Sequence, residues 1–206
     1  RFVDSTALYG LPDNLKNYII LDYKSNNPYV VKLSGWELDY QTRFWYLPGP
    51  LSGLVLNANY TVTESEVKYP RTELLIEVDF GPNGISTSKT NIDSFYVDRL
   101  IDQPDEIFNL SIGYDYKGFS GRLSVLSKSD VFMRTDFWPA LREATDDYTR
   151  WDLSVKQKLP VKGLEIFLNV NNITEAVDKN RYYTSNSLSL EQHYGKTIDL
   201  GFKFSF

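Results

Sequence analysis

The sequence contains no cysteine, a single histidine and a single methionine among its 206 residues. The absence of cysteine excludes disulfide bonds and thiolate metal sites. The one histidine, His193, excludes a metal site built from several histidines and leaves little basis for histidine-dependent catalysis. From these absences we expect no bound metal, no cofactor and no enzyme activity.

Long apolar runs are also missing. No stretch approaches the ~20 uninterrupted apolar residues of a membrane-spanning helix, and no segment has a clear helical period. A membrane β-barrel is still compatible with this, because its strands carry only an alternating signal. The net charge of -5 argues against a nucleic-acid partner. The chain starts at Arg1 without a signal sequence, so we expect a mature product or part of something longer.

Alternation of apolar and polar residues is the dominant pattern that is present. In the last segment Ile198, Leu200, Phe202, Phe204 and Phe206 alternate with polar or small residues. Side chains alternate faces along a strand, so this pattern predicts a strand with one apolar and one polar face. The same pattern predicts strands over residues 29–47, 51–64, 107–116, 119–129, 148–159, 164–173 and 198–206, and a hairpin from 73–80 and 93–100.

The connections between these strands alternate in length. Those at 48–50, 117–118 and 160–163 are tight, whereas those at 65–104, 130–148 and 175–193 are long. All tight turns therefore fall at one end of the sheet, as in outer-membrane barrels with short periplasmic turns and long external loops. Aromatic residues gather near both strand ends, as two interface girdles would require. A soluble antiparallel sandwich is the alternative, but it does not need either asymmetry.

The number of strands indicates an incomplete barrel. We count about seven long strands, and bacterial single-chain barrels normally have an even number. Either a strand in residues 15–24 is missed, or the chain is the C-terminal arc of a larger barrel. Such an arc has two unpaired edges. The fold predicted is therefore all-β, an antiparallel transmembrane β-barrel portion.

Three stretches carry a resemblance to a known family: residues 106–124, residues 151–156 with 164–174, and the terminal strand to Phe206. Together with 35–40 and 57–61, they resemble the C-terminal barrel of TonB-dependent outer-membrane receptors. The resemblance implies a barrel of roughly 22 strands, with residues 1–206 as its C-terminal portion and the plug domain and earlier strands outside it. It also implies a multi-pass protein of the Gram-negative outer membrane, in contact with lipid and lipopolysaccharide.

The resemblance further implies active transport of a scarce solute, driven when TonB, acting through the N-terminal region, remodels the plug. A ferric siderophore is the expected substrate; a cobalamin, or a glycan captured with a surface lipoprotein, is the alternative. A passive outer-membrane channel or structural barrel, and a soluble β-sandwich binding module, are the competing functions. The last residues resemble the signal that barrel-assembly machinery recognises, which the family assigns to Leu200, Phe202, Phe204 and Phe206.

Two sets of candidate functional residues follow. Aromatic and histidine side chains in the long loops are candidates for stacking on a ligand, with loop–loop packing as the alternative: Phe132, Phe137, Trp138, Tyr182, Tyr183 and His193. The acidic pair Asp146 and Asp147 is predicted to lie on a solvated loop. Polar residues opposite the apolar face are predicted to face the lumen and plug: Glu37, Asp39, Arg43, Asn57, Asn59, Arg122, Lys156, Asn169, Asn171 and Lys203.

Overall fold

The computed structural model describes residues 26–82, 84–136 and 138–205. The chain divides into two compact units. One comprises Arg1–Val31 and Val67–Asp98, and the other comprises Lys32–Glu66 and Arg99–Phe206.

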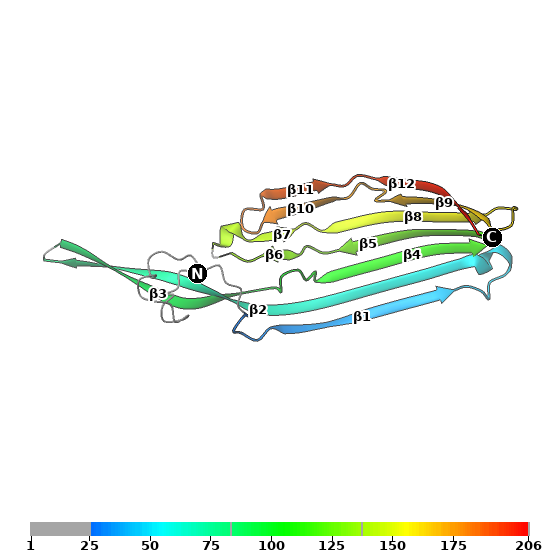
Figure 1. Cartoon of the computed structure of the whole chain (residues 1–206). Helices are drawn as coiled ribbons and strands as arrows, with labels where there is room; N and C mark the ends of the chain where they lie inside the picture. Colours follow the sequence, from blue (N-terminus) through cyan, green and yellow to red (C-terminus); the bar gives the residue numbers. More distant parts are fainter. Residues whose placement is uncertain (1–25, 83, 137, 206) are drawn as a thin grey trace. The chain divides into compact units, whose positions relative to one another are not determined.

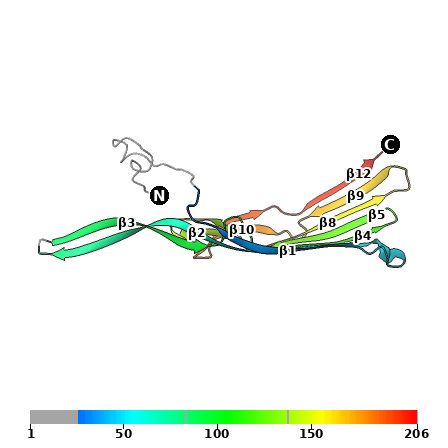
Figure 2. The same ribbon diagram turned by 90° about the horizontal axis from the view of Figure 1, so that it is seen from below.

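The larger unit is built on one antiparallel sheet (Figures 1 and 2). Its strands are, in order across the sheet, β1 (Lys32–Arg43), β2 (Leu54–Gly81), β4 (Glu106–Tyr116), β5 (Phe119–Lys128), β8 (Tyr148–Lys158), β9 (Leu164–Asn171) and β12 (Thr197–Phe204). Each of these seven strands pairs antiparallel with the next of the seven along the chain, and the seven strands predicted from alternation are confirmed. Within the described residues, β1 and β12 each pair with a single strand, so the sheet is open.

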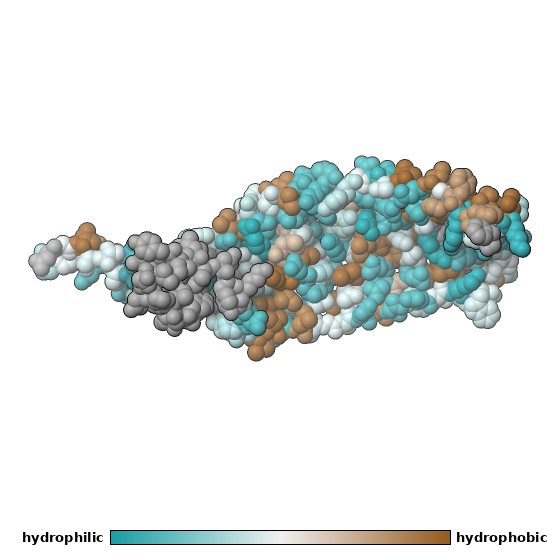
Figure 3. All heavy atoms as spheres, viewed as in Figure 1, coloured by the Kyte–Doolittle hydropathy of each residue, from teal (hydrophilic) through white to brown (hydrophobic). Residues whose placement is uncertain are grey.

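The register keeps the two faces of this sheet chemically distinct. Leu38 lies opposite Tyr60, and Tyr60 lies opposite Phe108, so apolar side chains form rows across the strands. Many apolar side chains on this face are exposed: Leu38 retains 62% and Leu200 67% of its accessible surface. Figure 3 shows hydrophobic residues gathered over the edge formed by β9 and β12. The sheet is a single layer, and its apolar face has no protein partner among the described residues.

The short connections differ in length from one another. β4 and β5 are joined by Lys117 and Gly118, which both have positive φ (47° and 82°), as a two-residue hairpin turn requires. The connection between β1 and β2 is longer than predicted, because β1 ends at Arg43 and a 3₁₀ helix, η2 (Gly49–Gly53), precedes β2. The predicted strands 29–47 and 51–64 are therefore too long at this connection, where residues 44–47 and 51–53 lie outside β1 and β2.

The smaller unit contains a long hairpin. β3 (Gly84–Asp98) pairs with residues 67–81 of β2, and the rings of Tyr69 and Tyr96 stack at 5.3 Å. A hairpin is present as predicted, but its second strand covers Gly84–Asp98 rather than 93–100. The predicted strand end at Glu64 is also wrong, because β2 continues without a break to Gly81. Pro70 is accommodated opposite Phe95, consistent with proline's place on edge strands.

A second, smaller sheet lies within the larger unit. It has the order β11 (Leu188–His193), β10 (Val177–Tyr182), β7 (Glu143–Thr145) and β6 (Phe132–Arg134). We call it the loop sheet, because it is formed by residues of the connections 130–148 and 175–193. The sequence predicts no strands in these two connections. A 3₁₀ helix, η3 (Pro139–Leu141), lies in the first of these connections. No helix in the described ranges is long and apolar enough to cross a membrane.

The packed interior is small and lies mainly at the loop sheet. Phe132, Val131 and Ala144 are buried there, with Phe132 fully inaccessible to solvent. The backbone N–H of Asp102 donates to the carbonyl of Phe132 at 2.9 Å, and Thr145 donates to Val131 at 2.8 Å. The loop sheet and the residue before it therefore contain three of the five buried apolar side chains found among the described residues, and the candidate site lies beside them.

Candidate functional site

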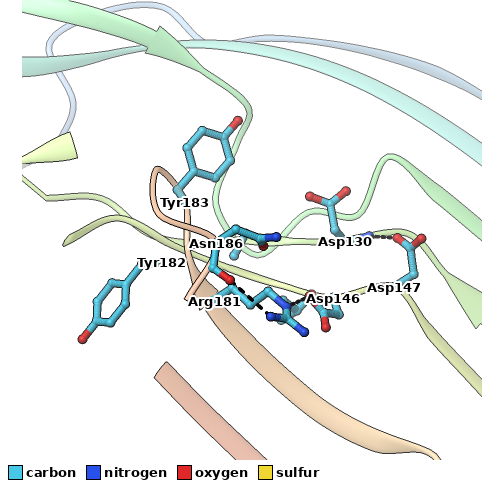
Figure 4. Close-up of a pocket in the computed structure, with 9 residues that line it drawn as sticks. Asp130, Asp146, Asp147, Arg181, Tyr182, Tyr183 and Asn186 are labelled. Atoms are coloured by element: carbon cyan, nitrogen blue, oxygen red, sulfur yellow. Dashed lines mark hydrogen bonds and ion pairs between the residues drawn. The ribbon is translucent and has the colours of Figure 1, made fainter. Parts of the chain in front are cut away.

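A cavity of about 490 Å³ opens at the loop sheet (Figure 4). It is formed by the two long connections that hold β6, β7 and β10. Its lining combines carboxylates, a guanidinium, an amide and two phenols: Asp130, Ala144, Thr145, Asp146, Asp147, Arg181, Tyr182, Tyr183 and Asn186. Among the described residues, no cluster of histidine, aspartate and glutamate has the arrangement of a metal site. The cavity suits a ligand held by hydrogen bonds and aromatic contacts.

Backbone pairing brings the two halves of the cavity together. In the pairing of β10 with β7, Arg181 lies opposite Ala144 and Tyr182 opposite Glu143. A tight turn then follows β10, in which the N–H of Asn186 donates to the carbonyl of Tyr182 at 2.8 Å. Asn186 has a φ of 54°, a left-handed conformation that asparagine tolerates better than most residues. This turn places Asn186 beside Arg181.

Arg181 is held at the centre of the cavity. Its Nε donates to Asp146 Oδ1 at 2.6 Å, and its Nη1 donates to the carbonyl of Asn186 at 3.2 Å. The hydrogen bond to Asp146 raises the pKa of the Arg181 guanidinium above its usual value, so the group stays charged. Asp146 is therefore paired, rather than simply solvated as predicted.

Asp130 and Asp147 form the opposite rim. The N–H of Asp130 donates to Asp147 Oδ1 at 2.8 Å, and the carboxylate of Asp130 accepts from Arg99 Nη2 at 2.6 Å. Arg99 also donates to Asp105 Oδ2 at 2.9 Å, and its side chain is only 20% exposed. The hydrogen bonds to Asp130 raise the pKa of Arg99 above its usual value, with Asp105 adding to the effect and burial opposing it.

The predicted ligand-binding residues have different environments. Tyr182 and Tyr183 line the cavity, and their rings point in different directions in Figure 4. Phe132 is fully buried, and its ring packs against that of Tyr183, with 5.6 Å between the ring centroids. Trp138 is 62% exposed next to η3. The ligand-binding role of these residues stays a prediction.

The remaining two predicted ligand-binding residues are Phe137 and His193. Phe137 is outside the described residues. His193 is exposed at the end of β11, and its Nε2 lies 3.2 Å from Glu191 Oε1. His193 is not part of the cavity lining, and its role in binding also stays a prediction.

The residues predicted to face the lumen share the second face of the main sheet. The register aligns Asp39 with Asn59, Arg43 with Val55, Arg122 with Ser154 and Lys203 with Glu165. Hydrogen bonds run along this polar face: Asn59 donates to Glu37 at 2.6 Å and Ser154 to Asn169 at 2.8 Å. A shallow cavity of about 410 Å³ lies over its centre. Contact with a plug or lumen water stays a prediction.

Asn172 is a structural residue that sequence reasoning missed. It is 7% exposed with a φ of 55°, and its N–H donates to Asp152 Oδ1 at 2.9 Å. Its side-chain amide donates to the carbonyls of Ala176 and Gly195, and its Oδ1 accepts from the N–H of Ala176. The adjacent Asn171–Asn172 pair at a strand end was the available signal, because asparagine favours left-handed turns.

The terminal strand places its apolar residues together. Leu200, Phe202 and Phe204 point to the same face of β12 as Ile198, and all are largely exposed. Phe206 lies outside the described residues. Recognition of this strand by assembly machinery stays a prediction.

The fold and its surfaces together define a class of protein. An antiparallel sheet with one exposed apolar face, short turns at one end and structured loops at the other is part of an outer-membrane β-barrel. The family model described as TonB dependent receptor-like, beta-barrel, matches residues 8–173. The chain belongs to the TonB-dependent receptor β-barrel family. No curated protein and no solved structure matches it.

Family membership establishes the general role. The chain is a non-enzymatic component of TonB-dependent transport in the Gram-negative outer membrane. The soluble-sandwich alternative is therefore wrong. The exposed apolar face of the sheet has a physical explanation, since lipid covers it in place of a protein core.

Proposed function

We propose that this chain is the C-terminal portion of a receptor that imports a ferric siderophore across the outer membrane. The observation that carries the proposal is the loop-sheet cavity, in which Tyr182 and Tyr183 accompany Arg181 and Asn186. Aromatic rings can stack on the organic chelator of a siderophore, while guanidinium and amide groups donate to its oxygen atoms. Trp138 adds a further exposed ring on the same loop.

The polar face of the main sheet supports a role for a plug domain in this transport. Its amide, hydroxyl and charged side chains offer donors and acceptors in rows, and these groups suit contact with a plug domain through hydrogen bonds. A plug that is remodelled by TonB would open the path from the loop cavity to the periplasm. A surface lipoprotein would be a further partner if the solute is instead a glycan.

Uptake by the intact receptor tests the proposal. Cells with the receptor as their sole route for the tested siderophore should accumulate radioactive iron, and deletion of TonB should abolish this accumulation. Replacing Tyr183 with Ala should weaken siderophore binding roughly two- to tenfold, the scale of one lost aromatic contact. The matched control is Tyr194→Ala, which removes an exposed tyrosine, 66% accessible, that does not line the cavity.

The outcomes separate the alternatives. Solute entry that persists without TonB would support a passive channel. TonB-dependent uptake of cobalamin or an oligosaccharide, with no uptake of any ferric siderophore, would overturn the substrate class and leave the transport role in place. Equal loss of binding in Tyr183→Ala and Tyr194→Ala would contradict the cavity as the binding site.

A further inference from the structure

The two ends of the main sheet differ in charge. The three short connections, residues 44–53, 117–118 and 159–163, contain Lys117 and Lys162 and no aspartate or glutamate. The long connections at the other end contain many carboxylates, including Asp130, Asp146 and Asp147. In this family of barrels the short turns face the periplasm. The turn end of the chain is thus its basic end, close to the periplasmic leaflet.

Two of these turns are adjacent. The N–H of Lys158, the last residue of β8, donates to the carbonyl of Gly118 at 2.9 Å. This bond places Lys158 beside the turn that contains Lys117, and Lys162 follows in the connection from β8 to β9. All three lysines are exposed. Glu165 lies opposite Lys158 in the register, but Lys203 flanks it from the other side, so positive charge prevails.

An aromatic cluster borders this basic turn on the apolar face. The ring of Tyr114 lies 6.1 Å from that of Tyr116 and 6.2 Å from that of Phe119. The ammonium group of Lys117 lies 5.2 Å from the centre of the Tyr116 ring. Tyrosine rings with an adjacent lysine are the side chains that favour the headgroup level of a bilayer.

An apolar strip continues from the cluster toward the middle of the sheet. Ile112 and Leu123 lie opposite each other in the pairing of β4 and β5, on the same face as Tyr114, and are 52% and 40% exposed. The nearest carboxylate on β4, Asp115, points to the other face and is bound to Arg122 at 2.6 Å. Cationic groups, aromatic rings and an apolar strip therefore follow one another along one face.

We propose that this patch binds an anionic phospholipid of the periplasmic leaflet. The phosphate group contacts Lys117 and Lys162, the glycerol region contacts the Tyr114, Tyr116 and Phe119 cluster, and an acyl chain lies along Ile112 and Leu123. Charge complementarity selects an anionic headgroup, since the two turn lysines are not accompanied by any acidic residue of their own turns. The adjoining apolar strip selects a lipid over free phosphate.

Native mass spectrometry of the intact receptor tests this site. The protein is purified in detergent and titrated with phosphatidylglycerol or phosphatidylcholine, and bound lipids are counted. The double variant Lys117→Gln, Lys162→Gln should bind phosphatidylglycerol roughly thirtyfold more weakly, the scale expected for two lost lysines at a membrane surface. Its binding of phosphatidylcholine should not change.

The matched control is Lys179→Gln, Lys196→Gln, which removes the same charge from the long-loop end, where these lysines face Glu191 and Glu175. It should retain phosphatidylglycerol. Heat-modifiable electrophoretic mobility verifies that each variant forms a barrel. Equal binding by the turn variant and the native protein, or equal loss in both double variants, would overturn the proposal. So would competition by the soluble headgroup glycerophosphoglycerol at the concentration at which the lipid binds.

Discussion

The main sheet and the loop sheet are stabilised by different means within one compact unit. The main sheet is a single layer in which register and alternation are regular, and large apolar residues such as Leu38 and Leu200 stay exposed. The loop sheet has strands as short as three residues, yet it buries Phe132 completely and is connected by ion pairs from Arg99 and Arg181. The main sheet therefore depends on contact with lipid for its stability, whereas the loop sheet depends on the packing of its own side chains.

This difference fits the surroundings of each sheet. In the bilayer, backbone groups must be bonded within the sheet and the apolar face needs no protein cover. In the aqueous loops, backbone pairing of short strands is marginal, so buried side chains and charged pairs have to hold the structure. Three substitutions test the contrast, in order of decreasing expected effect.

Phe132→Ala should have the largest effect, and the effect should be confined to the loop sheet. Replacing a fully buried phenylalanine with alanine costs about 3–5 kcal/mol, and Phe132 has no solvent exposure. Hydrogen exchange of the intact receptor should show faster exchange in β6, β7 and β10, with β4, β5 and β8 unchanged. Faster exchange throughout the main sheet would show that the two sheets do not behave separately.

Leu123→Lys should destabilise the main sheet in a bilayer. A lysine on the lipid face near the midplane costs about 2–4 kcal/mol, whereas a lumen-facing substitution has little effect. The control is Ser124→Lys, because Ser124 is the next residue and points to the polar face, where its Oγ donates to Ser111 at 2.9 Å. Urea unfolding in lipid vesicles measures both. Similar costs for the two variants would contradict the assignment of the faces.

Arg99→Met should have the smallest of the three effects. It removes hydrogen bonds to Asp130 and Asp105 from a side chain that is 20% exposed. The expected cost to the loop sheet is about 1–2 kcal/mol, the range for hydrogen bonds to charged groups reduced for partial exposure. Lys32→Met is the control, since its pair with Glu66 is highly exposed and should contribute nothing measurable. Hydrogen exchange of β6 and β7 would detect the difference.

The main sheet could be predicted from the sequence because the bilayer imposes a period of two on every strand. Ile198 to Phe204 alternate for this reason, and their pairing with β9 follows. One detail escaped the pattern: Gly201 lies opposite Phe167, and a Cβ at Gly201 would lie 2.5 Å from the Phe167 ring. The absence of a Cβ at Gly201 leaves room for the Phe167 ring. This requirement can be recognised only when the pairing of β9 with β12 is known.

The loop sheet could not be predicted in the same way. β6 and β7 have three residues each, too few to show any period. The cavity depends on contacts between distant residues, such as Arg181 with Asp146, which are 35 positions apart. The sequence alone indicated Tyr182 and Tyr183 as candidates, because aromatic side chains in a loop can stack on a ligand. The roles of Arg99, Asp130 and Arg181 became evident only from their contacts in the fold.

Asn172 holds together the two ends of the segment between β9 and β12, so changes in the length of this segment need not affect the main sheet. Asn172 is the first residue after β9, and its side-chain amide donates at 2.9 Å to the carbonyl of Gly195, which lies two residues before the last strand. The segment is therefore closed at its base, and the entropy of bringing its ends together depends only weakly on the length between them. We therefore expect that residues inserted or deleted near the β10–β11 turn leave the register of β9 and β12 unchanged. A receptor built this way can vary the outer loop and keep the same barrel.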